Sequence, residues 1–403
     1  MKRLTFFILI LSFWACAQPQ IKVQENREIH DGRDLLSQPL PGALQMEEYL
    51  PLLRDKRVGL VVNQSALVRG VHLLDTLRAL GIDVRKIFSP EHGFRGKADA
   101  GAHIDNGRDT KTGLPIISLY GKNRKPSKEQ LVDIDVLVFD IQDVGVRFYT
   151  YISTLHYVME ACAENGLPLL LLDRPNPNAH YVDGPVLDTN YRSFVGMHPV
   201  PVVYGMTIGE YGLMINGEHW LKGGEECALT VIKIGGYDHQ VHYPLPVKPS
   251  PNLPNYRSVL LYPSLCLLEP TKVSVGRGTN RQFQVYGHPS WDSSLYAFRP
   301  MPNEGAHHPK FEGQVCYGFD LSTKSEESIF NERKLNLSYL LNAWARTPHD
   351  AFFRSYKAFD RIAGTSRLRE QMQKGRSEEE IRGSWGRGID AFKKVRAKYL
   401  LYP

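Results

Sequence analysis

The first half of the chain alternates short, almost continuous apolar runs with longer segments in which apolar residues recur at helical spacing. Six apolar runs predict β-strands, at residues 57–63, 84–88, 115–120, 134–140, 168–173 and 228–234. Helices are expected around them, at residues 46–55, 70–80, 151–165 and 207–220. Strands that are apolar throughout and separated by helices are typical of a parallel sheet covered on both faces. The pattern therefore predicts an α/β fold for this part of the chain.

The pattern changes at about residue 245, where the alternation of strands and helices is lost. Proline, glycine and aromatic residues are dense in the segment that follows, and longer helical patterns return only at residues 335–345 and 377–399. We therefore expect two domains, a larger parallel-sheet domain over residues 45–244 and a smaller, mixed α/β domain over residues 245–403.

The N-terminus has the features of an export signal. Two basic residues precede an apolar run at residues 4–14, which is too short to span a bilayer and is followed by small residues. Cleavage could fall after Ala17, or Cys16 could become the lipidated first residue of a lipoprotein. We expect residues 1–17 to be the signal and residues 18–44 a polar tether. The protein is then periplasmic or an outer-membrane lipoprotein of a Gram-negative bacterium.

Composition and charge narrow the class of protein. A chain of 403 residues with 42% hydrophobic content is long enough to bury a large core. Its net charge of +6 comes from 49 basic and 43 acidic residues without a basic block, which argues against a nucleic-acid partner. The cysteines after the signal form no CxxC pair, so a zinc site made of cysteines is not expected. They are better explained as small, buried apolar residues.

One loop carries more chemistry than packing requires. The segment Ser-Pro-Glu-His-Gly-Phe-Arg-Gly follows the strand at residues 84–88 and brings together a carboxyl group, an imidazole and a guanidinium, on Glu91, His92 and Arg95. In an open α/β sheet, ligands bind outside the carboxyl ends of the strands. Glu91 is therefore the first candidate for a catalytic group, and His92 and Arg95 are candidate ligand-binding residues.

Three other strands of the first domain also end in polar residues. Together these strand ends contribute six further candidates: Asn63, Asp140, Asp143, Arg147, Asp173 and Arg174. The carboxyl ends of parallel strands lie on one edge of a sheet, so these residues predict a single cleft for a highly hydroxylated ligand. Taken singly, each of them could instead cap a helix or form a surface ion pair.

The segment at residues 140–151 combines a cation with flat apolar rings. Arg147 could hold a carboxylate in bidentate fashion, and the ring of Tyr149 could stack on the face of a sugar. Asp140 could instead have a structural role, as the partner of Arg147 or Arg174.

The second domain adds polar residues that could face the same cleft. Asn252 lies in the run Ser-Pro-Asn-Leu-Pro, and Glu269 has apolar neighbours. Arg277 and Arg281 are candidate receptors for an anion. The Gly-Arg-Gly run at residues 276–278 lacks the glycine spacing of phosphate-binding loops. Neither a dinucleotide nor a nucleoside triphosphate is therefore expected, and no other cofactor is indicated.

Six ordered segments resemble the motifs of one known family. They are SPEHGFRG at 89–96, FDIQDVGVRFYTYISTL at 139–155, LDRPNPN at 172–178, GMTIGE at 205–210, SPNLP at 250–254 and SVGRGTN at 274–280. On these motifs the chain resembles the exo-β-N-acetylmuramidase NamZ family, also described as DUF1343. The likeness runs from about residue 45 to the C-terminus, and six motifs in this order are highly specific.

The resemblance implies a fold, a reaction and a site. Family members have a Rossmann-like domain followed by a smaller α/β domain, with the active site in the cleft between them. The implied reaction is release of N-acetylmuramic acid from the non-reducing ends of peptidoglycan fragments, in cell-wall turnover and recycling. The catalytic glutamate of the family's PEHG motif corresponds to Glu91. The expected partners are peptidoglycan-derived disaccharides or glycan fragments, and a membrane is involved only if Cys16 carries a lipid.

Glycoside hydrolysis usually combines a protonated acid with a second group that acts at the anomeric carbon. Glu91 would be the general acid. For the second group the sequence leaves three options open. Asp140 or Asp143 could activate water, Glu269 could approach from the other domain, or the 2-acetamido group of the substrate could take part.

The lactyl carboxylate of muramic acid calls for a counter-ion that N-acetylglucosamine would not need. Arg147, Arg277 and Arg281 are the candidates. An arginine in this role would make the enzyme selective for the muramic sugar.

Two other functions compete with this interpretation. A zinc-dependent cell-wall amidase or deacetylase could use His92, His103, Asp140 and Asp143, but the spacing of zinc motifs such as HExxH is absent from the sequence. A non-enzymatic lipoprotein could merely bind muropeptides. Full activity after chelation would argue against the first function, and turnover that depends on Glu91 would argue against the second.

Overall fold

The computed structural model describes residues 38–91, 93–94 and 107–403. The expected signal peptide and most of the expected tether lie outside these residues, as do His92, Arg95 and His103. No helix within the described ranges is long and apolar enough to cross a membrane.

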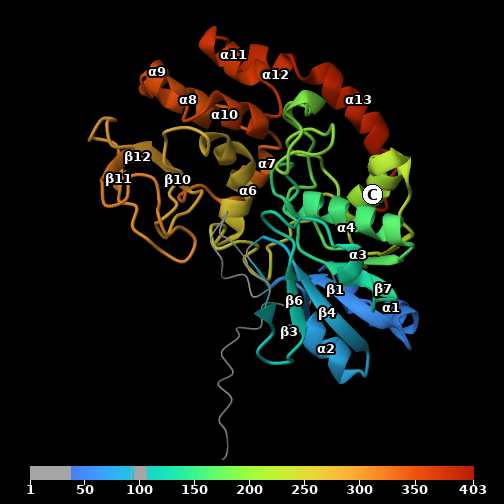
Figure 1. The fold of residues 1–403 in the computed structure, drawn as a ribbon. Helices are drawn as coiled ribbons and strands as arrows, with labels where there is room; N and C mark the ends of the chain where they lie inside the picture. Colours follow the sequence, from blue (N-terminus) through green and yellow to red (C-terminus); the bar gives the residue numbers. More distant parts are fainter. Residues whose placement is uncertain (1–37, 92, 95–106) are drawn as a thin grey trace, which may run out of the picture. The chain divides into compact units, whose positions relative to one another are not determined.

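A seven-stranded sheet forms the centre of the first domain (Figure 1). Its strands are β1 Arg57–Val62, β4 Asp83–Ser89, β5 Gly107–Arg108, β6 Pro115–Ser118, β7 Val136–Asp140, β8 Leu169–Leu172 and β9 Leu229–Ile232. They follow the order β5-β6-β4-β1-β7-β8-β9, and all neighbours are parallel except β5 and β6. The predicted α/β fold with a parallel sheet is confirmed.

The strand order contains the reversal that creates a ligand crevice in this class of fold. From β1 the chain adds β4 and β6 on one side, then crosses back to add β7, β8 and β9 on the other. This is a Rossmann-like order, and its switch point lies between β1 and β7. The loops that leave the carboxyl ends of the central strands diverge there and leave room for a ligand.

Helices cover both faces of the sheet because side chains alternate along each strand (Figure 1). The covering helices are α1 Met46–Leu53, α2 Leu73–Ala79, α4 Tyr151–Asn165 and α5 Ile208–Gly217. On β7, Leu137 and Phe139 belong to the apolar core that includes residues of α4 and α5. Val136 and Val138 belong to the opposite core, which includes residues of α1 and α2.

Residues 39–44, which were expected to belong to the tether, pack onto the first domain. Leu40 and Gly235 exchange two backbone hydrogen bonds of 2.8 Å. The 3₁₀ turn η1 Gly42–Leu44 follows, and the amide of Gly42 donates to the carbonyl of Asp173 at the end of β8. The folded domain therefore begins several residues before residue 45.

The second region is mixed α/β, as expected, with α6 Tyr256–Leu265 and a small antiparallel sheet of order β10-β12-β11. The strands of this sheet are β10 Val285–His288, β11 Tyr296–Phe298 and β12 Cys316–Asp320. The helices that follow are α7 Glu326–Asn331, α8 Ser338–Arg346, α9 His349–Phe352, α10 Tyr356–Ala363, α11 Arg367–Gln373, α12 Glu378–Gly383 and α13 Gly386–Arg396. The remaining short elements are β2 Leu67–Val68, β3 Val71–His72, α3 Lys128–Leu131, η2 Thr189–Tyr191, η3 Lys222–Gly224 and η4 Cys266–Leu268.

The single helix expected at residues 377–399 is two helices, α12 and α13. The break falls at Ser384 and Trp385, between Gly383 and Gly386. Glycine in a helix interior costs about 1 kcal/mol relative to alanine, so two glycines at this spacing favour a break between them.

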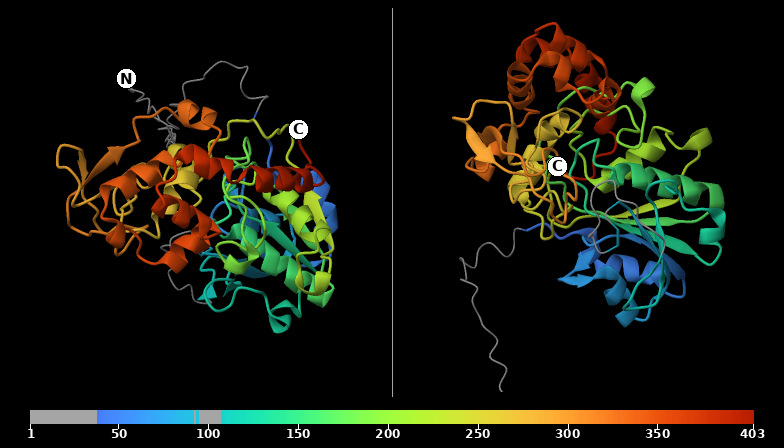
Figure 2. Two further views of the ribbon diagram at one scale, coloured as in Figure 1. Left: turned by 90° about the horizontal axis from the view of Figure 1, so that it is seen from above. Right: turned by 60° about the vertical axis from the view of Figure 1, so that its left-hand side comes forward.

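The two regions share one core, and the end of the chain returns to the first domain (Figure 2). A single apolar cluster contains Val144 of the first region and Leu337 of the second. The hydroxyl of Tyr402 donates to Oδ2 of Asp173 at 2.6 Å. Pro39–Pro403 accordingly form one compact unit.

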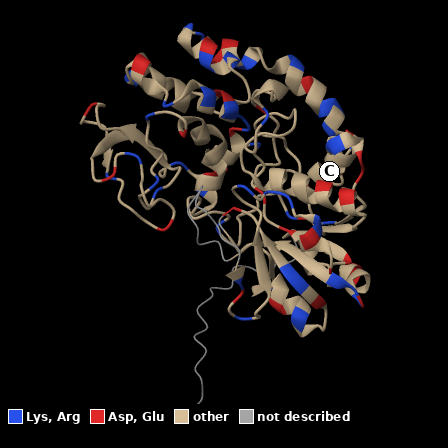
Figure 3. Ribbon diagram, viewed as in Figure 1, with Lys and Arg blue, Asp and Glu red and all other residues tan. Residues whose placement is uncertain are grey.

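Charged residues of both signs are interspersed along the C-terminal helices and the helices around the large sheet (Figure 3). This distribution matches the sequence, in which basic and acidic residues are mixed rather than grouped by sign. It gives these helices polar outer faces without concentrating one charge.

Candidate active site

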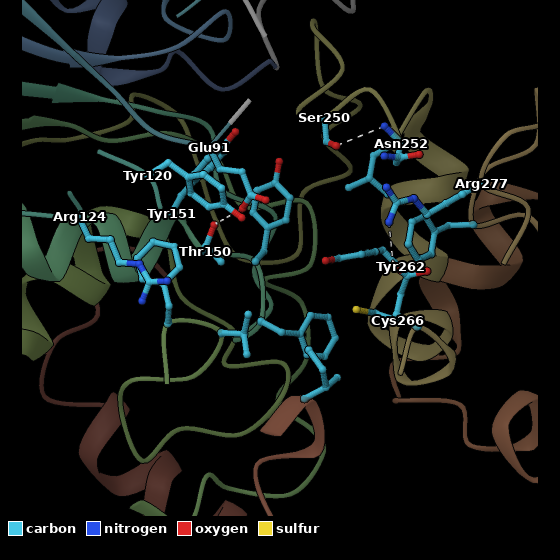
Figure 4. A pocket seen from close by; sticks show the side chains of 18 residues that line it. Glu91, Tyr120, Arg124, Thr150, Tyr151, Ser250, Asn252, Tyr262, Cys266 and Arg277 are labelled. Atoms are coloured by element: carbon cyan, nitrogen blue, oxygen red, sulfur yellow. Dashed lines mark hydrogen bonds and ion pairs between the residues drawn. The ribbon is translucent and has the colours of Figure 1, made fainter. Parts of the chain in front are cut away.

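A cavity of about 320 Å³ lies between the carboxyl edge of the large sheet and the start of the second region. Its volume is at the lower end of the range for small-molecule sites. One wall carries Glu91, Tyr120, Arg124 and Thr150, and the other carries Ser250, Asn252, Tyr262 and Arg277 (Figure 4). The cavity is therefore located between the two regions, where the family resemblance implied a site.

Glu91 lines this cavity from the loop that leaves β4. Gly93, whose φ of +76° is left-handed, helps to turn the chain just after it. Oε2 of Glu91 accepts a hydrogen bond of 2.9 Å from the hydroxyl of Thr150 (Figure 4). Thr150 is the N-cap residue of α4 but caps no backbone amide with its side chain, so its hydroxyl can serve Glu91. The end of β4 and the start of α4 together position this carboxyl group.

Two tyrosines surround Glu91. Burial raises the pKa of the Tyr120 phenol, and the charge of Glu91 and a hydrogen bond to it raise this pKa further. Burial also raises the pKa of Tyr151, and the charge of Glu91 adds to that effect. Both phenols therefore stay protonated at neutral pH and can donate hydrogen bonds inside the cavity.

Asn63 supports this arrangement from behind the cavity. It is completely buried just after β1, and its Nδ2 donates to the hydroxyl of Tyr151 at 2.9 Å. Its Oδ1 accepts from the amide and the hydroxyl of Ser65, at 3.0 and 2.6 Å. Asn63 was expected to bind substrate, whereas the structure places it as the support of a tyrosine that lines the cavity.

Aromatic rings form an apolar part of the wall. Tyr149 lines the cavity as expected, and its hydroxyl donates to the carbonyl of Pro249 at 2.8 Å. Its ring meets Tyr262 edge to face at a centroid distance of 6.0 Å, and Phe148 meets the same ring at 5.5 Å. These rings offer the kind of surface on which the apolar face of a sugar can pack.

The opposite wall carries predicted residues of the second domain. Glu269 and Arg277 form an ion pair with 3.1 Å between Oε2 and Nη1. Nη2 of Arg277 also donates to the carbonyl of Gly305 at 3.1 Å. Asn252 donates from Nδ2 to the same carbonyl at 2.6 Å, and its Oδ1 is buried without a hydrogen-bond partner in the described part of the chain. The cavity thus contains an acceptor that a ligand could satisfy.

Asp140 and Arg174 lie outside the cavity and pair with each other. Arg174 donates from Nε to Oδ1 of Asp140 at 2.5 Å and from Nη2 to Oδ2 at 2.9 Å. Both side chains are almost completely buried. Asp140 was expected to activate water and Arg174 to bind substrate, but the structure commits both to a bidentate ion pair. Of the two roles that the sequence left open for Asp140, the structural one is observed.

The other two predicted aspartates are also buried away from the cavity. Asp143 accepts a hydrogen bond from the hydroxyl of Tyr204, and burial raises its pKa to about 6. Asp173 accepts a hydrogen bond from Tyr402, and burial raises its pKa to about 7. Neither aspartate lines the cavity, so the structure places neither Asp143 as a base nor Asp173 as a substrate ligand.

Two of the three arginines expected to face the lactyl carboxylate lie elsewhere. Arg147 is fully buried, and its guanidinium donates to four backbone carbonyls, those of Pro185, Val200, Ile362 and Ala363. Arg281 pairs with Asp320 and donates to the hydroxyl of Tyr296 at 2.6 Å. Of the three candidates, Arg277 alone lines the cavity.

The residues named for a zinc site are not brought together in the described structure. His92 and His103 lie outside the described residues, and Asp140 and Asp143 are engaged as given above. Over residues 38–91, 93–94 and 107–403, no three His, Cys, Asp or Glu side chains form a group that could hold a metal ion.

Two family models match consecutive parts of the chain. Residues 58–257 match the model described as exo-beta-N-acetylmuramidase NamZ, N-terminal, and residues 260–402 match its C-terminal counterpart. The chain belongs to the NamZ family. The resemblance drawn from six motifs is confirmed, and with it the enzyme class, a glycoside hydrolase of the exo-β-N-acetylmuramidase family.

Individual NamZ-family proteins match along nearly the whole chain. The peptidoglycan beta-N-acetylmuramidase NamZ of Bacillus subtilis (strain 168) is 38% identical over 410 residues, which cover 96% of this chain and 95% of that protein. A crystal structure of a DUF1343 family protein from Bacteroides fragilis NCTC 9343 matches with a TM-score of 0.84 and 46% identity, over 91% of this chain and 99% of that one. A second such structure from the same organism matches with a TM-score of 0.77 and 30% identity, over 91% and 100%.

In this NamZ-family member, several residues that line the cavity were not predicted from the sequence. Tyr120 and Arg124 follow β6, whose carboxyl end, like that of β9, was assigned no candidate. The position of that strand in the sheet could have indicated them. Phe194 and Tyr262 come from a loop and from α6. Nothing in the local sequence of these two segments indicates that they approach the sheet edge.

Proposed function

We propose that this protein is an exo-acting glycoside hydrolase that releases N-acetylmuramic acid from the non-reducing ends of peptidoglycan fragments, with Glu91 as the general acid. The observation that carries this proposal is the position of Glu91, a partly buried carboxyl group that lines the cavity and accepts a hydrogen bond from Thr150. Membership of the NamZ family supports the reaction, and the activity named for the Bacillus subtilis relative supports the substrate.

In the proposed reaction, Glu91 gives its proton to the glycosidic oxygen as the bond between that oxygen and the anomeric carbon breaks. Water supplies a hydroxyl group to the anomeric carbon, and its remaining proton restores Glu91, so no further reactant is needed. Thr150 and Tyr120 hold the carboxyl group through hydrogen bonds, which limits the directions in which it can deliver the proton.

Glu269 is the protein group best placed to assist at the anomeric carbon. It lines the opposite wall of the cavity, whereas Asp140 and Asp143 are buried outside it. The 2-acetamido group of the substrate is the other option, and Oδ1 of Asn252 could accept a hydrogen bond from its N–H. A loss of activity in Glu269→Gln as large as that in Glu91→Gln would support Glu269, and a loss of a few fold would support the acetamido group.

The proposal can be tested with a chromogenic β-glycoside of N-acetylmuramic acid and its N-acetylglucosamine counterpart. Together these substrates test which bond is cleaved, which sugar is preferred and whether the enzyme acts on a terminal sugar. The wild-type protein should hydrolyse the muramic glycoside faster. Glu91→Gln should lower kcat/KM by about 100- to 10,000-fold, the usual contribution of a general acid. Glu226→Gln, which changes an exposed glutamate outside the cavity, serves as the matched control. An unchanged rate in Glu91→Gln, or no hydrolysis by the wild type, would contradict the proposal.

We also propose that the protein acts outside the cytoplasm, in the periplasm or as an outer-membrane lipoprotein. The basic start, the apolar run and the small residues within positions 1–17 support export, and Cys16 supports lipidation. Mass spectrometry of the mature N-terminus should find a lipid-modified Cys16, or an unmodified chain that begins after Ala17. A mature chain that retains Met1 would contradict export.

A further inference from the structure

Among the residues that the structure describes, two arginines line the cavity, Arg124 and Arg277, and they approach it from opposite walls (Figure 4). Arg124 belongs to the loop between β6 and α3, whereas Arg277 belongs to the second region. They differ in what they already bind, and this difference decides which of them can serve a ligand.

The guanidinium of Arg277 is already paired with groups of the protein. Its Nη1 lies 3.1 Å from Oε2 of Glu269, and its Nη2 donates to the carbonyl of Gly305. A carboxylate brought by a ligand would have to compete with Glu269 at this position. Arg277 is therefore the less suitable receptor for an anionic substituent.

The guanidinium of Arg124 lies over an aromatic ring instead. Its Cζ is 4.4 Å from the centroid of the Phe194 ring, which is a cation–π contact. Within the described residues, Nε of Arg124 is buried and has no hydrogen-bond partner, and no carboxylate pairs with the guanidinium. A buried donor without an acceptor is unfavourable, so this N–H points to a ligand that supplies one.

Both parts of this arrangement are fixed by contacts to α4. Lys125, the residue after Arg124, donates from Nζ to Oε1 of Glu160 at 2.8 Å. The carbonyl of Phe194 accepts a hydrogen bond of 2.7 Å from the hydroxyl of Ser153. The cation and its aromatic partner are thus held in place before any ligand arrives, which lowers the entropic cost of binding.

We propose that Arg124 binds the carboxylate of the lactyl ether of N-acetylmuramic acid, and that this contact selects the muramic sugar over N-acetylglucosamine. The inference rests on the proposed function, which supplies the sugar. The N–H groups of a guanidinium match a carboxylate in bidentate geometry. Among the described residues, two carboxyl groups line the cavity, Glu91 and Glu269, and they accept hydrogen bonds from Thr150 and Arg277. A carboxylate for Arg124 would therefore come from the ligand.

A second role for Arg124 predicts a different result. Its charge lowers the pKa of Tyr120, and Tyr120 in turn contacts Glu91. If Arg124 acted only along this route, its loss would affect every substrate equally, whether or not the sugar carries a lactyl group. Selective loss on the muramic sugar therefore separates recognition from an effect on the proton donor.

The test combines three sugars with three variants. The sugars are N-acetylmuramic acid, its lactyl amide, which has no charge, and N-acetylglucosamine, each as free sugar for calorimetric binding and as chromogenic β-glycoside for kcat/KM. The variants are Arg124→Gln, Arg124→Lys, which keeps the charge but not the paired N–H groups, and Arg277→Gln, which tests the competing arginine of the opposite wall. Arg124→Gln should weaken binding and kcat/KM for the acid about 10- to 100-fold, as expected for hydrogen bonds to a charged group. The amide and N-acetylglucosamine should change by less than about twofold, and Arg124→Lys should fall in between.

Three outcomes would overturn the assignment: equal losses on all three sugars in Arg124→Gln, the selective loss in Arg277→Gln instead, or no change in either variant. Circular dichroism and melting temperature identify any variant that fails to fold. If Arg124→Gln fails to fold, Arg124→Lys is compared with the wild type in its place. If the wild type hydrolyses none of the glycosides, the proposed function fails. The binding measurements then still decide whether Arg124 recognises the lactyl carboxylate.

Discussion

At the scale of single residues, Thr150 joins the start of α4 to the proposed proton donor. Replacing Thr150 by valine keeps the shape and removes the hydrogen bond of 2.9 Å to Glu91. We expect kcat/KM on the muramic glycoside to fall about 10-fold, because hydrogen bonds to charged groups contribute about 1.5 kcal/mol or more. Thr150→Ser should keep most of the activity. Wild-type activity in Thr150→Val would mean that this bond does not position Glu91.

The buried Asp143 should make the free energy of unfolding depend on pH. Burial raises its pKa from the ordinary 3.8 to about 6, so the folded protein holds this proton more tightly than the unfolded chain. The stabilisation is complete below about pH 3.8 and is lost as the pH rises through about 6. Asp143→Asn cannot titrate, so the free energy of unfolding of the variant should rise relative to that of the wild type by about 2 kcal/mol from pH 4 to pH 7.

Urea denaturation at several pH values measures this difference. Asp390→Asn, which changes an exposed aspartate on α13, provides the control, and it should follow the wild type at every pH. A constant difference between Asp143→Asn and the wild type across this range would show that Asp143 is not protonated in the folded protein.

The sequence could identify polar strand ends but not their surroundings. Glu91, Asn63 and Asp140 all follow apolar strands, yet Glu91 lines the cavity while the other two are completely buried. A strand end that faces a partner such as Arg174 and one that faces a cavity have the same local pattern. Arg174 is brought to Asp140 by the pairing of β7 with β8, which local periodicity does not describe.

At the scale of elements, the loop between β7 and α4 depends on a glycine conformation. Gly145 has a φ of +78°, and an added Cβ would lie 2.2 Å from Oδ1 of Asn176. The Nδ2 of Asn176 donates to the carbonyl of Met206 at 2.7 Å, so this side chain cannot move away without losing that bond. Gly145→Ala should therefore lower the free energy of unfolding by about 2 to 4 kcal/mol.

Gly166 offers a matched comparison for this prediction. It also has a positive φ, of +64°, but nothing lies within 4 Å of an added Cβ. Gly166→Ala should cost only about 1 to 2 kcal/mol, the price of the left-handed backbone alone. Chemical denaturation of both variants measures the two costs, and equal values would show that the contact with Asn176 is unimportant.

Regular elements were predicted well where the apolar pattern is strong. All six predicted strands are present, and α4 spans the predicted residues 151–165. The prediction was less accurate where proline and glycine are dense. α6 was not predicted, because Pro263 inside it argues locally against a helix. The helix expected at 377–399 is divided into two. In α6, packing against the shared core outweighs the local preference of proline, whereas the division at 377–399 follows the local preference of its two glycines.

At the scale of the whole molecule, Arg147 connects segments that are distant in the sequence. Its guanidinium hydrogen-bonds to carbonyls of two loops and of α10, including Ile362, which lines the cavity. Arg147→Met would leave these carbonyls buried without donors, and the free energy of unfolding should fall by about 3 to 5 kcal/mol.

The same variant separates this role from the one that the sequence suggested. Because Arg147 does not line the cavity, the ratio of kcat/KM for the muramic glycoside to that for the N-acetylglucosamine glycoside should stay at the wild-type value, measured at a temperature where the variant is folded. A selective loss on the muramic glycoside without loss of stability would restore Arg147 as a substrate ligand.

The return of residues 402 and 403 to the first domain has a consequence for the order of folding. Tyr402 contacts Asp173, and the carbonyl of Pro403 accepts hydrogen bonds from the amide and the ring of His239. These contacts join residues that are 229 and 164 positions apart in the sequence. Closing loops of this length costs much chain entropy, so we expect these contacts to be among the last that form during folding.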